Sequence, residues 1–279
     1  MVERVRKWAS NELSFVRQVW QRFSKDNGFL LAAAVSFYGF LSLFPLLLLA
    51  VGVLGYFIGS PEHAAAILGR SLGKFIVGPN PQAMLASIIH GKNTATGIGL
   101  VVLLWSSTSA IVVLEKAMNL AWATTVKRGF VKQRLIAVLT LVVIAVLAAV
   151  SFGISVLIRI ASETSTPYLS WLREITPALK YPLPVLASIG LFVTIYKLLP
   201  HTRVSWRTAL VGGALAGILW ELAKHVFAFY IVHFPRNNEV YGSLASVILL
   251  MLWLDYSAII AILGAEFAAL WSQGREGTA

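Results

Sequence analysis

Long apolar blocks divide this chain, and each of them is long enough to cross a lipid bilayer. No charged residue occurs between residues 27 and 61, although a spanning helix needs only about 20 residues. Five more apolar blocks follow, and soluble folds rarely contain runs of that length. The pattern predicts an all-α, polytopic membrane protein with six transmembrane helices, one within 27–61 and others at about 95–114, 135–158, 181–199, 208–232 and 241–271.

The segments outside these blocks carry amphipathic patterns. Residues 2–23 repeat apolar side chains at helical spacing, with most basic residues elsewhere around the helix, which predicts an interfacial helix. A cleavable signal peptide is the rival interpretation, but the apolar run that follows is too long for one. We therefore expect an interfacial helix at 1–28, a six-helix bundle at 29–272 whose outer loop at 59–94 holds short amphipathic helices, and a tail at 273–279.

Composition agrees with lipid as the solvent. Hydrophobic residues make up 58% of the 279 residues, charged residues 13%, and the mean hydropathy is +0.77, whereas a soluble domain has about 25% charged residues. Cysteine is absent from the sequence. This excludes disulfides, thiol catalysis and cysteine-ligated zinc or iron–sulfur sites.

The basic residues predict the orientation of the helices. Segments that fall on one side under the six-helix assignment hold 15 Lys and Arg, and those on the other side hold 7. By the positive-inside rule, both termini are cytoplasmic. The net charge of +11 favours anionic lipid headgroups over nucleic acid as the partner, because the basic residues flank apolar blocks. Whether the protein forms a homo-oligomer stays open.

Ionisable residues at membrane depth are the main functional candidates, because each costs at least about 2.5 kcal/mol to insert. Glu221, Lys224 and His225 share one helical face, so Glu221 can pair with either base. Asp255 lies near the middle of the last span and can meet Lys224, bind a cation or proton, or line an aqueous route. Glu266 lies on the same stripe but nearer the cytoplasmic end, where it can be interfacial.

Other polar and small residues carry mainly structural interpretations. Tyr38 and Ser42 make the first half of the first span polar, and Pro45 predicts a kink in it. Glu115 is expected at a solvated helix end, and Ser106 to Ser109 as hydrogen-bonding groups between helices. Two further groups complete the candidates: Asn238, Tyr241 and Gly242 at the turn into the last span, and Gly212, Gly213 and Gly217 as a close-packing face.

Three segments give the chain a family resemblance. Residues 32–45 (AAAVSFYGFLSLFP), 220–230 and 241–266 (YGSLASVILLMLWLDYSAIIAILGAE) resemble the YihY or virulence factor BrkB family, once labelled ribonuclease BN. The resemblance covers nearly the whole chain. It implies a six-helix protein of the bacterial inner membrane, linked to envelope integrity, with no established substrate. An aromatic residue is common in the family where this chain has Asp255, so a role for that charge would apply to a subset.

Three functions follow as hypotheses. The first is a transporter or exporter of a lipid-like or small amphiphilic solute, indicated by the kinked span and the intramembrane charges. The second is a non-catalytic scaffold of the envelope, in which the same charges are closed pairs. A ribonuclease is disfavoured, because the 12 acidic residues and five histidines show no metal-ligand spacing. We expect no enzymatic activity, no cofactor and no metal.

Overall fold

The computed structural model describes residues 2–42, 59–60, 96–126, 128–144, 146, 182–233 and 244–276. These residues form helices without any strand, as the sequence predicted for the fold class. Pro45, Asn238, Tyr241, Gly242 and nearly all of the outer loop at 59–94 lie outside the described residues. The helices are α1 (Val2–Lys25), Gly28–Ser42, α5 (Thr96–Ala121), 130–144, α8 (Pro182–Leu198), α9 (Trp206–His233) and α11 (Leu244–Glu276).

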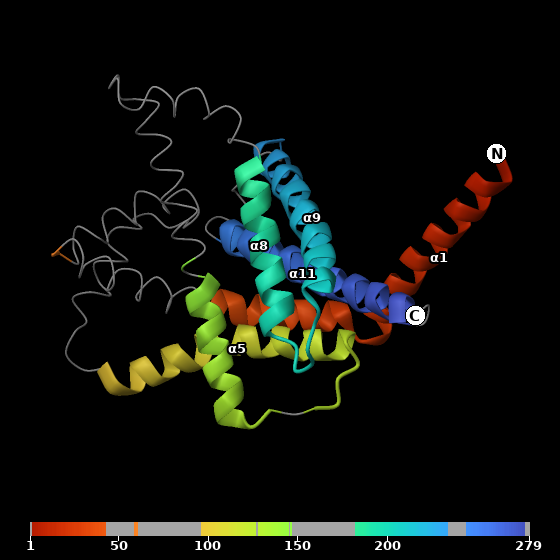
Figure 1. The fold of residues 1–279 in the computed structure, drawn as a ribbon. Coiled ribbons are helices and arrows are strands. Elements are labelled where there is room, and N and C mark those ends of the chain that lie inside the picture. The colour runs from red at the N-terminus through yellow and green to blue at the C-terminus, as the bar shows by residue number, and fades with distance from the viewer. Residues whose placement is uncertain are drawn as a thin grey trace, which may run out of the picture.

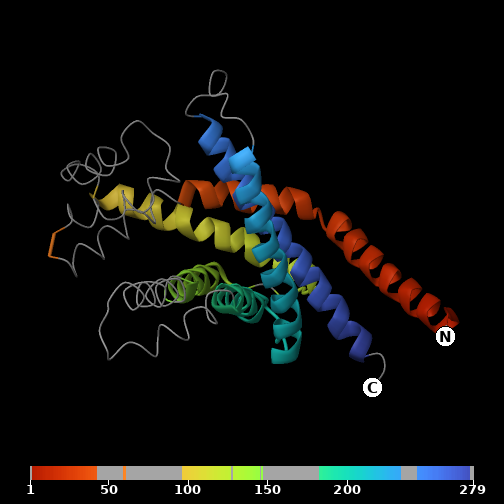
Figure 2. The same cartoon turned by 90° about the horizontal axis from the view of Figure 1, so that it is seen from above.

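Helix α11 packs against α1, α5 and α9, and α9 packs against α8 as well as α11. The helix Gly28–Ser42 lies beside α5 in both views (Figures 1 and 2). Helix α1 projects away from the bundle and meets α11 near the C-terminus. The structure thus has a packed centre of α5, α8, α9 and α11, with α1 attached at one end.

The small face predicted for α9 is confirmed as the contact with its neighbours. A Cβ atom placed on Gly213 would lie 2.8 Å from the backbone nitrogen of Val193, and one on Gly217 would lie 2.8 Å from that of Ile189. On another side of α9, a Cβ on Gly212 would lie 2.5 Å from the Cβ of Ala268. The glycines therefore allow the backbones of α8 and α9 to approach closely.

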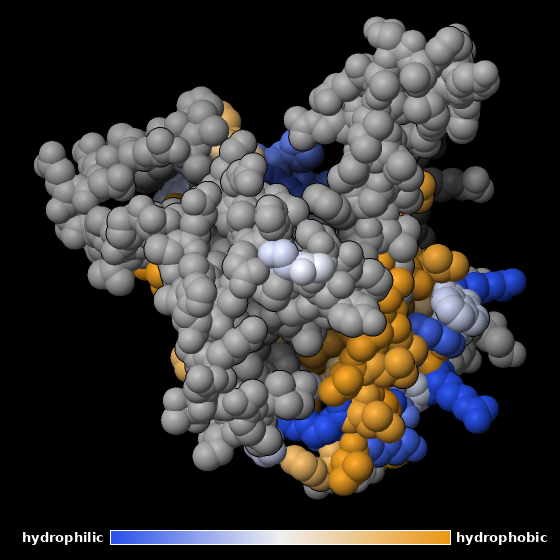
Figure 3. Space-filling view, turned by 90° about the vertical axis from the view of Figure 1, so that its left-hand side faces the viewer, coloured by the Kyte–Doolittle hydropathy of each residue, from blue (hydrophilic) through white to orange (hydrophobic). Residues whose placement is uncertain are grey.

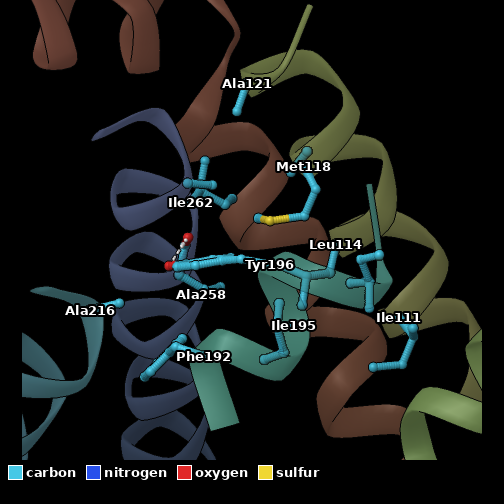
Figure 4. Packing of buried hydrophobic residues seen from close by; sticks show 14 of the residues in the cluster. Ile111, Leu114, Met118, Ala121, Phe192, Ile195, Tyr196, Ala216, Ala258 and Ile262 are labelled. Atoms are coloured by element: carbon cyan, nitrogen blue, oxygen red, sulfur yellow. Dashed lines mark hydrogen bonds between the residues drawn. The ribbon is translucent and has the colours of Figure 1, made fainter. Parts of the chain in front are cut away.

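Tyr196 forms the centre of the buried core and joins three helices (Figure 4). Its side chain is fully buried, and its hydroxyl donates to the carbonyl of Ala261 on α11 at 2.8 Å. Its ring lies 6.1 Å from that of Trp122, just beyond α5. Gly264 leaves room for the hydroxyl, since a Cβ there would lie 2.3 Å from it.

Local sequence signals set the helix boundaries around this core. Helix α8 begins at Pro182, whose missing N–H costs nothing at a first helical position. Ser205 caps α9 by accepting the Thr208 N–H at 3.1 Å. Between α1 and the next helix, Asn27 takes a left-handed conformation (φ 56°). Gly28 follows it because the Phe23 ring occupies the space where a Cβ would stand.

Large apolar side chains remain exposed on the outer surface. On the helix at 130–144 they recur at helical spacing, as Val131, Leu135, Leu139 and Val142. Figure 3 shows apolar residues gathered in a band beside hydrophilic ones. Among the described residues, Trp206–Tyr230 and Val247–Gly274 are long and apolar enough to span a membrane, and Gly28–Ser42 and Pro182–Leu198 are apolar but shorter.

Candidate functional site

Glu221 faces α8 and sits in a closed arrangement of partners. Its carboxylate accepts a hydrogen bond from the Ser188 hydroxyl and pairs with Lys224 Nζ at 2.7 Å. The ammonium group also lies 4.7 Å from the centre of the Trp220 ring. His225 uses Nδ1 toward the backbone carbonyl of Glu221 at 2.7 Å, not toward the carboxylate. Of the two bases that the spacing allowed, Lys224 is the one that pairs.

Lys224 pairs with Glu221 in the described part of the chain, and no ion pair joins it to Asp255, which was one of three alternatives that the sequence left open. Asp255 is half-buried, and its Oδ1 is a buried atom without a hydrogen-bond partner in the described part of the chain. Glu266 is also not interfacial, because only 1% of its surface is exposed. Both of its oxygens lack a hydrogen-bond partner among the described residues. Asp255 and Glu266 therefore differ from Glu221, whose charge is compensated.

The first apolar helix contributes polar contacts of two kinds. The Ser36 hydroxyl donates to the carbonyl of Met251 on α11 at 2.8 Å, so this side of the helix faces the bundle. Ser42 donates to the Gly39 carbonyl within its own helix at 2.7 Å. Tyr38 is exposed, with 36% of its surface accessible. Tyr38 and Ser42 therefore do not converge on the ionisable groups of α9 and α11.

An apolar groove of about 470 Å³ runs between α9 and α11, and the sequence analysis missed it. None of its described lining residues is charged. Glu221 and Ala223 are two positions apart, which places them about 200° around the helix from each other. Helix α9 thus presents its charged pair to one side and the groove to another. The lining residues are Leu219, Leu222, Ala223, Val226, Phe227, Tyr230, Leu252, Trp253 and Tyr256.

Aromatic rings connect this groove with the core. Trp220 meets Phe192 of α8 edge to face and lies tilted against Trp253 of α11, at ring distances of 6.1 and 5.9 Å. Its indole N–H donates to the Ser257 hydroxyl at 3.0 Å. Trp253 in turn lies 5.0 Å from Phe227. Ring packing and a hydrogen bond therefore hold the side chains of the groove wall in place.

A second polar cluster is buried where α5 and α8 end. Glu115 is fully buried, so its expected position at a solvated helix end was wrong. Its carboxylate contacts His201 Nε2 and lies 3.7 Å from Arg128. Arg128 also donates to the carbonyls of Leu199 and Pro200, at 3.1 and 2.8 Å. The cluster thus ties the segment after α5 to the turn between α8 and α9.

Two further contacts hold His201 in place. Its backbone N–H donates to Asn119 Oδ1 at 2.8 Å, and its Nδ1 lies 2.6 Å from the Val126 carbonyl. No local pattern could have found this cluster, because Glu115 and His201 are 86 positions apart. The sequence places Asn119 one helical turn after Glu115, but this spacing is equally typical of two residues on an exposed surface.

Arg134 shows a similar long-range role. Its guanidinium donates to the Thr108 hydroxyl at 2.5 Å and lies 4.3 Å from the centre of the Trp105 ring. Thr108 and Ser109 also donate to the Trp105 carbonyl within α5. The described hydroxyls of the second apolar block therefore hydrogen-bond to an arginine of the next helix as well as to the backbone of their own helix.

The fold, its apolar surface and its relatives define the class, a helical membrane protein. The chain belongs to the virulence factor BrkB family, whose pattern it matches over residues 19–279.

Three relatives of the chain are described as UPF0761 membrane proteins. The one from Tolumonas auensis is 28% identical over 95% of this chain and 90% of its own length. That from Ralstonia nicotianae is 28% identical over 98% of this chain, and that from Xanthomonas axonopodis pv. citri is 30% identical over 98%. This chain spans 62% and 64% of these two longer relatives. No solved structure matches the chain.

Proposed function

We propose that the protein moves a lipid-like amphiphile across the bacterial inner membrane, without enzymatic chemistry. The observation that carries this proposal is the apolar, aromatic-walled groove between α9 and α11. Ligand sites are typically concave and mostly apolar, with a few polar groups that fix orientation. Among the lining residues, Tyr230, Trp253 and Tyr256 carry polar side-chain atoms. An acyl chain fits such a lining, whereas a hydrophilic solute finds no partners in it.

The proposed topology is six spans with both termini in the cytoplasm. It is supported by contacts between segments that the basic-residue count assigns to one side. Arg128 meets Pro200, His201 meets Asn119, and Arg22 donates to Gln273 at 2.7 Å. Basic side chains near these contacts, such as Lys132 and Arg203, would face anionic headgroups at the cytoplasmic surface.

We expect the purified protein, reconstituted in liposomes, to speed the exchange of a fluorescent phospholipid between leaflets. The Ala223→Trp variant should lose at least about tenfold of this rate, because the indole fills the groove against Trp253. Chemical reduction of the outer-leaflet dye by an impermeant agent measures the exchange.

Ala228→Trp is the matched control for this test. Ala228 is also on α9, is exposed and does not line the groove. Its exchange rate should equal that of the wild type. Liposomes in which the protein gives no exchange above empty vesicles would reject phospholipid transport. Equal rates for both tryptophan variants would reject the groove as the path.

A scaffold function is the second candidate, and the closed Glu221–Lys224 pair favours it. Thiol labelling separates the two, because the chain has no native cysteine. Single cysteines at positions 221, 224, 255 and 266 would be treated with membrane-impermeant reagents. If the pathway is aqueous, position 221 or 255 labels while exposed Ile218, an apolar control on α9 outside the groove lining, does not. If all four positions label only after denaturation, the result favours the scaffold function.

A further inference from the structure

Glu266 is a deeply buried acidic residue to which the described part of the chain gives no hydrogen-bond donor. Only 1% of its surface is exposed, and the neighbouring Ala265 and Ala269 are fully buried. Neither carboxylate oxygen has a hydrogen-bond donor in the described part of the chain. A buried carboxylate without donors is strongly disfavoured in its charged form. A bound proton would cancel the charge of the group.

An acidic group from another part of the chain acts on Glu266. Asp26, in the turn after α1, acts on the Glu266 side chain through its charge and a side-chain hydrogen bond, and Arg22 is the cation that acts on Glu266. Two carboxyl groups can hydrogen-bond one another only when one of them carries a proton. Two adjacent carboxylates that are both ionised repel each other. With one shared proton the pair carries a single negative charge, which Arg22 balances.

The other helices around Glu266 supply no competing partner in the described residues. On α8, the Tyr196 hydroxyl already donates its hydrogen bond to the Ala261 carbonyl. On α5, Glu115 pairs with His201 and Arg128. Helix α9 brings Gly212 against Ala268, with no ionisable group in that contact. The described residues also contain no group of three or more metal-binding side chains, so a proton suits the site better than a metal ion.

We infer that Asp26 and Glu266 form a proton-binding site that fastens the end of α1 to α11. The joint is built from few other contacts. Phe15 meets Phe267 edge to face at 5.3 Å, and Arg22 donates to Gln273 at 2.7 Å. Loss of the shared proton would leave two negative charges in contact at this joint. The docking of α1 on the bundle thus depends on proton binding, whatever solute the protein handles.

Infrared spectroscopy of the full chain in lipid nanodiscs tests the proton directly. At neutral pH, the wild type should show the carbonyl stretch of a protonated carboxyl group. Glu266→Gln should remove this band because the acid is gone. Asp26→Asn should also remove it, since the new amide can donate to Glu266 and stabilise its ionised form. Glu221→Gln is the control and should leave the band unchanged, because Glu221 is paired with Lys224.

Identical spectra of the wild type and Glu266→Gln in this region would overturn the inference. If Glu266→Gln does not fold, the spectrum of Asp26→Asn tests the inference by itself. This variant is expected to fold, because Asp26 is only half-buried in a turn. This readout needs no transport, so it can succeed or fail independently of the proposed function.

Cross-linking tests the mechanical consequence. With cysteines in place of Phe15 and Phe267, a short bifunctional thiol reagent should join α1 to α11. As the pH is raised, the yield should fall severalfold relative to the same pair in a Glu266→Gln background. That background corrects for the reactivity of the thiols themselves. Equal pH dependence in both backgrounds would show that the joint does not respond to the proton.

Discussion

Gly213→Ala is expected to destabilise the protein by about 3 kcal/mol, the upper part of the range for overpacking. The added methyl group would lie 2.4 Å from Val193 Cγ2 and 2.8 Å from the Val193 backbone nitrogen. A side chain can rotate away, but the backbone of α8 cannot move without separating the two helices. The fraction of folded protein left after heating in detergent, followed by size-exclusion chromatography, measures the effect.

Gly190→Ala supplies the matched control on the partner helix. Nothing lies within 4 Å of the position that its Cβ would take. Alanine is the better helix former by about 1 kcal/mol, so this variant should equal or exceed the stability of the wild type. If both variants behaved alike, the close approach of α8 and α9 would not exist in the membrane.

Apolar length and small-residue patterns were enough to predict the α8–α9–α11 centre. The predicted span at 208–232 became α9, Trp206–His233, and that at 181–199 became α8, Pro182–Leu198. The glycines of α9 also indicated a packing face in the sequence. Such signals work because each is local: a run of apolar residues or a repeat at helical spacing reports on one helix.

Long-range contacts explain why the candidate site was predicted less well. The spacing of Glu221 and Lys224 revealed a pair within one helix, three positions apart. It could not reveal Ser188 on another helix. Glu266 looked interfacial because it stands near the end of an apolar block, yet only 1% of its surface is exposed, and Asp26 from the turn after α1 acts on it. Burial there depends on how α1 returns over α11, which no local pattern records.

The groove was missed for a related physical reason. Its lining residues read as ordinary lipid-facing positions, since Leu222 and Val226 are apolar and exposed. A groove arises only where two such surfaces diverge, and this depends on the crossing of α9 and α11. Because apolar side chains suit both lipid and an amphiphilic ligand, composition alone cannot distinguish these two uses.

Glu115→Ala is the second change with a large expected effect. It would leave Arg128 and His201 facing a buried cavity without their anion. Removing one partner of a buried ion pair typically costs about 3 to 5 kcal/mol, and we expect a loss at the lower end because 15% of the Arg128 side chain is exposed. Unfolding by increasing fractions of a denaturing detergent measures it. Lys116→Ala, exposed on the same helix, should change little.

A double-mutant cycle decides whether the loss comes from the contact with His201 or from the cavity alone. Glu115→Gln keeps the shape of the side chain and removes its charge, and His201→Gln keeps a hydrogen-bonding group near the Val126 carbonyl. We expect a coupling energy of about 1 to 2 kcal/mol, because residues that share a polar network are not additive. Strict additivity would mean that this contact does not join α5 to the turn before α9. The ends of α5 and α8 would then be held by Arg128 and its two carbonyl partners instead.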